Sequence, residues 1–292
     1  MLVSLFGNTF QDPSLGDLKS LIATLLDEGM DVEVERDFYD WLTSALTLSP
    51  RVRRVSEPSR GTAMVISCGG DGTLLRAARW VGEREIPVAG INTGHLGFLT
   101  AWHTSDISSL VRSIKRDEVK VEARTLVQLI SPALEPEVWP YALNEIALLK
   151  ENTGSMITIR AEVDGRFLAD YEADGLLIAT PSGSTAYNLS AGGPILQPDV
   201  PAFILNPVCP HMLTMRPLVI NDSCVVRTVV ASRTGRFLVS IDGTTVSLAS
   251  EVPLEMRRAP FTLRLVRRDG DDFSSALRDK LLWGANVSPR SV

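Results

Sequence analysis

The sequence predicts an α/β N-terminal domain with a Rossmann-like parallel sheet, an all-β C-terminal domain of the β-sandwich type, and a C-terminal helix that packs back on the first domain. Strand-like and helix-like patterns alternate over about the first 100 of the 292 residues. From about residue 120, β-rich runs separated by turn signals fill the chain, and one helical pattern follows them. We therefore expect three parts, over residues 1–115, 116–270 and 271–292.

The first part contains four apolar runs that are typical of strands. They cover 2–7, the stretch around Val32 and Val34, 63–68 and 86–92. Helical periodicity follows the first three of these runs. The expected helices are the stretch in which Leu18, Leu21, Ile22 and Leu25 share one face, then 38–48 and 73–82. The polar stretch 49–61 holds two prolines and four arginines, and we expect it to be a surface loop. Strands that alternate with helices pair in parallel, with helices on both faces of the sheet.

The second part contains seven β-rich runs. They cover 121–130, 141–150, 156–163, 175–180, 224–232, 236–242 and 261–268. The pair Asp164-Gly165 favours a tight hairpin turn, and a series of short strands is typical of a sandwich. The helical pattern at 274–284 places Leu277 and Leu281 on one face. Because the all-β region offers no other helix to receive it, we expect this helix to pack on the first domain.

Composition narrows the possible classes of protein. The apolar fraction of 45% and charged fraction of 22% are those of a globular protein. A net charge of −6 disfavours nucleic-acid binding through a broad basic surface. The cysteines, Cys68, Cys209 and Cys224, form no CxxC pair, so neither a disulfide framework nor a zinc site is expected. The N-terminal residues do not resemble a signal peptide, and no apolar run is long enough to span a membrane. We expect a cytoplasmic location and no membrane partner.

The stretch CGGDGTLL, residues 68–75, follows the apolar run 63–67. Three glycines there, Gly69, Gly70 and Gly72, would let phosphate oxygens approach the backbone N–H groups where a helix begins near Thr73. The loop matches neither GxGxxG nor GxxxxGK[ST], which disfavours dinucleotide dehydrogenases and P-loop enzymes. A carboxylate beside phosphate repels it, so Asp71 is expected to take a proton or to hold Mg²⁺. An ordinary turn is the alternative, because Gly and Asp both suit turns.

Further motifs follow in the chain. They are INTGHLGFLT (91–100), NEIALL (144–149), DGLLIATPSGSTAYNLSAGGPI (174–195) and PHMLTMRPLVI (210–220). In this order, with GGDGT, the sequence resembles the NAD kinases over roughly residues 60–245. The resemblance implies phosphorylation by ATP of the 2′-hydroxyl of the adenosine ribose of NAD, with Asp71 as the catalytic base. It also implies the two-domain fold and a homo-oligomer, dimer or tetramer.

The resemblance also implies binding roles for residues outside GGDGT. NAD binding is assigned to Asn144, Glu145, Asp174, Thr185, Ala186, Tyr187, Asn188 and Ser190. On sequence alone, a polar strand end is the favoured interpretation of Asn144-Glu145. Asp174 also fits a turn, and the hydroxyl-rich loop 181–193 also fits a solvated loop. Arg76 follows GGDGT and faces either the phosphates or the solvent. The histidines His95, His103 and His211 do not have metal-ligand spacing. Mg²⁺ is expected to arrive with the ATP phosphates, because it keeps waters and needs only one or two protein carboxylates.

Two positions depart from the family pattern. Thr244 and Thr245 follow Asp242-Gly243, where the family often carries a Gln, and Glu172 precedes Asp174, where it often carries a basic residue. Two alternatives to an NAD kinase stay open from the sequence. Diacylglycerol and sphingosine kinases share the GGDGT loop, although loop 181–193 is more polar than a lipid site requires. A catalytically silent NAD(P) sensor would carry the same binding residues.

Overall fold

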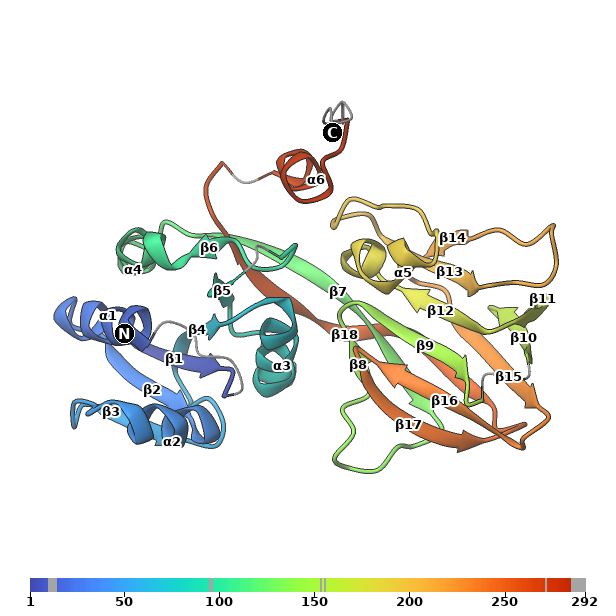
Figure 1. Ribbon diagram of the computed structural model, residues 1–292, viewed down its shortest axis with the longest axis horizontal. Helices are drawn as coiled ribbons and strands as arrows, with labels where there is room; N and C mark the ends of the chain where they lie inside the picture. The colour runs from blue at the N-terminus through green and yellow to red at the C-terminus, as the bar shows by residue number, and fades with distance from the viewer. Residues whose placement is uncertain (10–14, 95–96, 153, 155, 271, 285–292) are drawn as a thin grey trace, which may run out of the picture. The chain divides into compact units, whose positions relative to one another are not determined.

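The chain forms two compact units, shown in the computed structural model of Figure 1. The structure describes residues 1–9, 15–94, 97–152, 154, 156–270 and 272–284. The first unit comprises Met1–Ala123 with Leu263–Val292, and the second comprises Arg124–Thr262. The chain passes from one unit to the other within two long strands, β7 (Lys120–Ser131) and β18 (Leu254–Arg267).

The first unit is built on a parallel sheet in the order β5-β4-β1-β2-β3. Its strands are β1 (Leu2–Gly7), β2 (Asp31–Glu35), β3 (Val52–Val55), β4 (Thr62–Cys68) and β5 (Val88–Asn92). Strand β5 also pairs in parallel with β6 (Trp102–His103) and with the end of β18. The helices are α1 (Leu15–Asp27), α2 (Arg36–Ala45), α3 (Asp71–Val81), α4 (Ile107–Lys115) and α6 (Phe273–Leu281), with 3₁₀ turns η1 (Gly82–Arg84) and η2 (Thr104–Asp106).

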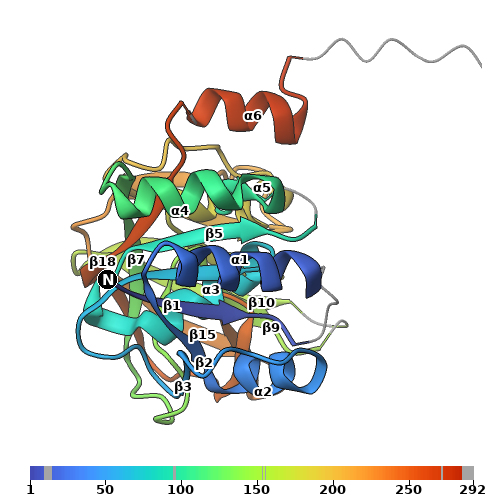
Figure 2. The ribbon, with the colours of Figure 1, turned by 90° about the vertical axis from the view of Figure 1, so that its left-hand side faces the viewer.

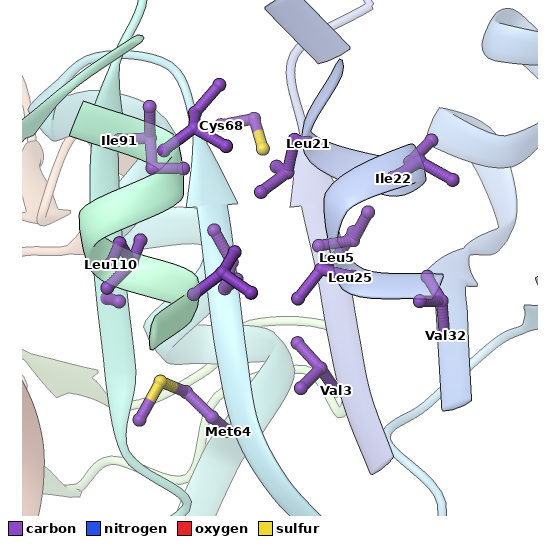
Figure 3. Packing of buried hydrophobic residues seen from close by; sticks show 14 of the residues in the cluster. Val3, Leu5, Leu21, Ile22, Leu25, Val32, Met64, Cys68, Ile91 and Leu110 are labelled. Atoms are coloured by element: carbon purple, nitrogen blue, oxygen red, sulfur yellow. The ribbon is translucent and has the colours of Figure 1, made fainter. Parts of the chain in front are cut away.

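Successive strand residues point to opposite faces of the sheet, and apolar residues of its strands are buried on both faces. Val3 and Leu5 of β1 join one buried cluster with Leu21 of α1 and Leu110 of α4, as Figure 3 shows. Helices α1 and α4 lie side by side over this face (Figure 2), and α2 contributes to the same cluster. Helix α3 packs elsewhere on the sheet, against β4, β5 and β1. The unit is therefore the layered α/β structure that the sequence predicts.

The second unit is a β-sandwich. One sheet is antiparallel in the order β14-β13-β12-β9-β16-β17, and the other contains β11-β10-β15 with parts of β18 and β7 and the short β8. The remaining strands are β8 (Tyr141–Ala142), β9 (Glu145–Lys150), β10 (Ile157–Val163), β11 (Arg166–Ala173), β12 (Gly175–Ala179), β13 (Ala202–Val208), β14 (Leu218–Asn221), β15 (Val226–Ser232), β16 (Arg236–Ile241) and β17 (Thr244–Ala249). Phe203 and Phe237 of one sheet share a buried cluster with Ile159 and Val230 of the other.

The predicted fold class is confirmed, with differences in single elements. The expectation of a surface loop over 49–61 was wrong for its middle, where Val52 is buried and β3 pairs in parallel with β2. Helix α4 was missed although its apolar residues share one buried face. The expected limits of the three parts, 1–115, 116–270 and 271–292, remain a proposal. In the described part of the chain, no helix is long and apolar enough to cross a membrane.

Candidate active site

The GGDGT loop connects the end of β4 to the first turn of α3, as expected from the sequence. Gly70 is the N-cap of α3, and Asp71 is its first residue. Gly69 has a φ of +148°, and a Cβ on it would overlap the buried side chain of Thr73, so the position requires glycine. Gly72 is exposed, and a Cβ built on it would meet open space. A helix N-terminus that follows such a loop favours an anion.

The carboxylate of Asp71 is held by main-chain N–H groups of the loop that follows β5. Phe98 donates its N–H to Oδ2 at 2.6 Å, and Leu99 and Thr100 donate theirs to Oδ1 at 3.1 Å. The hydroxyl of Thr100 donates to Oδ1 at 3.2 Å. A Cβ on Gly97 would overlap this carboxylate, which explains the second glycine of INTGHLGFLT. This link was not predicted from the sequence, in which Gly97 is only the second glycine of INTGHLGFLT.

The other candidates of the first unit lie outside this hydrogen-bond network. Arg76 is exposed on α3, and its guanidinium lies 6.0 Å from the centre of the Phe6 ring. His103 is exposed at the start of η2, and His95 lies outside the described residues. The guanidinium of Arg76 therefore contacts an aromatic ring and is not paired with Asp71.

In the second unit, Asp242 fixes the start of β9. It sits in the turn between β16 and β17 with a φ of +45°. Its carboxylate accepts N–H groups from Leu143 at 2.6 Å, Asn144 at 2.8 Å and Glu145 at 3.1 Å. The carbonyl of Asn144 in turn accepts the N–H of Thr180 at 2.8 Å. Asp242 therefore sets the position of Asn144 and Glu145. In the sequence it was noted only where the chain departs from the family pattern.

The carboxyl group of Glu145 is strongly perturbed by its surroundings. Burial, with the nearby charge of Asp242, raises its pKa to about 8, while the N–H of Tyr187 acts in the opposite direction. Burial also raises the pKa of Asp242 to about 6, against the three N–H groups that it accepts. Among the described residues, Oε2 of Glu145 is buried and has no hydrogen-bond partner. These surroundings therefore favour the protonated form of Glu145 at neutral pH.

Asp174 immediately precedes β12, and it is paired with a cation from the neighbouring strand. Lys150 Nζ of β9 lies 2.6 Å from Asp174 Oδ1, and both side chains are partly exposed. The preceding residues Glu172 and Ala173 carry no basic group. Lys150 therefore places a positive charge beside Asp174 from the neighbouring strand. The residues next to Asp174 in the sequence could not indicate this contact.

The loop after β12 is more ordered than a solvated loop. It forms a 3₁₀ turn, η3 (Ser182–Thr185), followed by one helical turn, α5 (Tyr187–Ser190). Tyr187 is 39% exposed, and its backbone N–H donates to Glu145. Thr185 and Ala186 are half-buried, whereas Ser190 is exposed. This loop and the start of β9 therefore meet at Glu145.

Asn188 differs from the other loop candidates because it is fully buried. Its Nδ2 donates to the carbonyls of Ser184 at 3.2 Å and Pro194 at 3.0 Å, and its Oδ1 accepts from Asn206 at 3.0 Å. A Cβ on Gly193 would overlap the Asn188 amide. The side chain braces the loop internally, so we no longer expect it to contact a nucleotide.

Known proteins resemble this chain over nearly its whole length. The family model for the ATP-NAD kinase N-terminal domain matches residues 18–119, and the model for the ATP-NAD kinase C-terminal domain matches residues 143–267. The NAD kinase of Bacteroides fragilis ATCC 25285 is 41% identical over 98% of this chain and 99% of its own length. The NAD kinase of Cytophaga hutchinsonii is 35% identical over the same shares of the two chains.

Two solved structures have similar folds. Yeast NADH kinase complexed with NADH matches with a TM-score of 0.87 and 24% identity, over 100% of this chain and 90% of the yeast chain. An NAD kinase from Archaeoglobus fulgidus in complex with ATP matches with a TM-score of 0.72 and 26% identity, over 92% of this chain and 94% of its own.

Proposed function

This chain belongs to the NAD kinase family and catalyses the ATP-dependent phosphorylation of NAD, and we propose that Asp71 is the general base that acts on the ribose 2′-hydroxyl. The observation that supports this role is the fixed carboxylate. Asp71 accepts three main-chain N–H groups where a glycine loop meets the N-terminus of α3. A general base must be held within reach of the proton that it takes.

The proposed reaction moves one phosphoryl group. The 2′-oxygen forms a bond to the γ-phosphorus while the bond from that phosphorus to the bridging oxygen of ADP breaks. The hydroxyl proton passes to the Asp71 carboxylate, because a ribose hydroxyl keeps its proton at neutral pH and is otherwise a poor nucleophile. General-base catalysis of this kind typically contributes about 10²–10⁴-fold in rate. Most of the remaining acceleration comes from positioning and from stabilising charge on the phosphoryl oxygens.

We further propose that the NAD substrate is bound by the second unit. A carboxylate at Glu145 can accept both hydroxyls of a ribose, and Asn144 offers one donor and one acceptor. Tyr187 presents a partly exposed ring for stacking, and Asp174 can accept from a carboxamide. The remaining proposed contacts come from Thr185, Ala186 and Ser190.

The phosphate side of the proposed site is the GGDGT loop. Gly69, Gly70, Gly72 and Thr73 would supply backbone N–H groups and the α3 N-terminus to ATP phosphates, with Arg76 as an additional cation. A divalent cation, which we propose to be Mg²⁺, would neutralise those phosphates. The described residues contain no group of three or more His, Cys, Asp or Glu side chains that could hold a metal ion. This donor set fits a cation carried largely by phosphates and water.

We propose that the protein forms a homo-oligomer through strand β14, at the edge of the antiparallel sheet of the second unit. Strand β14 has a single neighbour, β13, in the described sheet. Leu218 and Val219 on this strand are exposed, and Leu213 in the loop before it is 90% exposed. An edge strand with exposed apolar side chains favours pairing with another chain. We also propose a cytoplasmic location, which the three free thiols support.

The proposed function is tested by a coupled assay. The purified protein is incubated with NAD, ATP and Mg²⁺, and the product is detected by a dehydrogenase that accepts only NADP. Parallel reactions contain diacylglycerol in place of NAD. We expect NADP and no phosphorylated lipid. Lipid phosphorylation would favour the lipid-kinase alternative, and NAD binding without turnover in either reaction would indicate a sensor.

A further inference from the structure

Two cations of the first unit, Lys280 and Arg267, bind carbonyl groups of the loop whose N–H groups bind Asp71. Lys280 Nζ on α6 donates to the carbonyl of Gly97, and it lies 5.1 Å from the centre of the Phe98 ring. Arg267 at the end of β18 is 6% exposed, and its guanidinium donates to the carbonyl of Phe98 at 3.3 Å. Both cations come from residues more than 160 positions after the loop in the sequence.

The two carbonyls belong to the peptide groups that bind Asp71. The carbonyl of Gly97 shares its peptide group with the N–H of Phe98, which donates to Asp71 Oδ2 at 2.6 Å. The carbonyl of Phe98 shares its peptide group with the N–H of Leu99, which donates to Asp71 Oδ1 at 3.1 Å. Each peptide group therefore has a cation at its oxygen and the Asp71 carboxylate at its hydrogen.

We propose that Lys280 and Arg267 are positioning residues for phosphoryl transfer, which act on Asp71 through these two peptide groups. The proposal rests on the role of Asp71 as general base. A cation at a peptide oxygen polarises that group, and hydrogen bonds in a chain strengthen one another. Bonds that involve ionised groups are also the shorter and stronger ones. Helix α6 is thus a part of the catalytic apparatus, although it is far from GGDGT in the sequence.

Lys280 is less buried than Arg267 and can therefore be substituted with less effect on packing. Arg267 is almost fully buried, so its substitution would disturb folding. Lys280 is half-buried near the end of α6. Arg278 lies on the same helix, is exposed, and donates to Ser275 in its own helix. Lys280→Met and Arg278→Met therefore remove the same charge from the same helix, and only the first removes a contact with the Gly97 carbonyl.

We expect Lys280→Met to lower kcat by about tenfold or more, which is the scale of a lost hydrogen bond from a charged group. The KM for NAD, the affinity for NAD measured by calorimetry and the melting temperature should change little. Lys280→Arg should restore most of the rate, and Arg278→Met should retain it. The proposal is overturned if Lys280→Met keeps the wild-type kcat, or if its rate falls only together with NAD affinity and melting temperature.

A double-mutant cycle tests whether the effect passes through Asp71. If Lys280 acts by positioning this carboxylate, Lys280→Met should have almost no further effect on kcat in an Asp71→Asn background. A full additional loss in the double variant would contradict the proposal. The cycle also separates the two proposals. Loss of activity in Asp71→Asn with none in Lys280→Met contradicts only the positioning role, whereas near-normal activity in Asp71→Asn contradicts both.

Discussion

At the scale of single residues, Asp71 links two loops of the first unit. As the first residue of α3 it lies beside a glycine loop, and as a hydrogen-bond acceptor it holds the loop from Phe98 to Thr100. The sequence presented a choice between a turn residue and a catalytic acid. The structure shows a contact that fixes the turn, and the proposed role as a base would need a carboxylate held in this way.

Asp71→Asn should lower kcat by about 10²–10⁴-fold, because an amide cannot accept the proton of the ribose hydroxyl. NAD affinity, measured by calorimetry, should change only a few-fold. The amide retains one acceptor oxygen for several donors, so some thermal stability will also be lost.

Thr100→Val is the matched control for that loss. It removes the hydroxyl that donates to Asp71 at 3.2 Å but leaves the carboxylate in place. If Thr100→Val, at a similar melting temperature, loses as much kcat as Asp71→Asn, then Asp71 only holds the loop. An Asp71→Asn protein with more than about a tenth of the wild-type kcat would also contradict the proposed base.

Glu145 should make NAD binding depend on pH. Burial and the nearby charge of Asp242 raise its pKa to about 8, which favours the protonated carboxyl group at pH 7. Ribose hydroxyls donate hydrogen bonds, and the ionised carboxylate accepts them better. Binding below pH 8 therefore requires loss of the proton, and NAD affinity should rise between pH 6.5 and 8 by up to about tenfold per pH unit, then level off.

Calorimetry in buffers of different ionisation enthalpy should detect the proton that is released. The range above pH 6.5 keeps Asp242, with its pKa of about 6, mostly ionised. Glu145→Gln should abolish the slope. An affinity that falls as pH rises would instead show that Glu145 binds the nucleotide as a protonated donor.

At the scale of elements, loop 181–193 illustrates what composition alone misses. Its hydroxyls and glycines are typical of a solvated loop, but η3 and α5 form within it because buried groups hold it together. Asn188 donates to the carbonyls of Ser184 and Pro194, which joins the two ends of the loop. This bracing leaves Tyr187 partly exposed at the first position of α5.

Tyr187→Ala should raise the KM for NAD by about tenfold or more, because stacking on a base contributes roughly 1–3 kcal/mol. The KM for ATP should change much less. Tyr187→Phe keeps the ring and serves as the control, with a KM for NAD close to that of the wild type. Equal increases in both KM values would place Tyr187 in the fold of the loop and not in the NAD site.

Elements were predictable from the sequence where periodicity was strong. Helix α1 has Leu18, Leu21, Ile22 and Leu25 buried on one face, as the spacing of these leucines and isoleucine indicates. Strand β3 was not predictable, because only Val52 of its four residues is fully buried and arginines occupy its middle. Its position comes from parallel pairing with β2, which is a tertiary contact and leaves no local pattern.

At the scale of the whole molecule, the order of motifs predicted the two-part fold, but hydrogen bonds between distant residues were not readable. Asp242 binds N–H groups of residues 143–145, almost 100 positions earlier. Lys150 meets Asp174 across two neighbouring strands. One sequence shows which residue types are present, whereas strand register decides which of them meet. The motifs were therefore visible in the sequence, whereas the residues that hydrogen-bond to them were not.

The proposed homo-oligomer is testable at this scale. Leu213→Asp places a charge on the most exposed of the large apolar side chains in the described chain. We expect light scattering coupled to size-exclusion chromatography to show a smaller assembly than for the wild type, because the charge would have to be buried at the interface. Leu213→Met should retain the wild-type mass. A monomeric wild-type protein, or an unchanged mass for Leu213→Asp, would contradict this interface.

The discontinuity of the first unit sets the order in which a growing chain can complete it. Translation produces Met1–Ala123 early, then the whole second unit, and only afterwards the residues from Leu263 onward. Those late residues include the part of β18 that pairs with β5, and also Arg267 and Lys280. A ribosome-bound chain that ends before them already has GGDGT and Asp71, yet it lacks both cations that hold the partner loop. Biosynthesis therefore completes the support of the Asp71 loop last, after the second unit has been made.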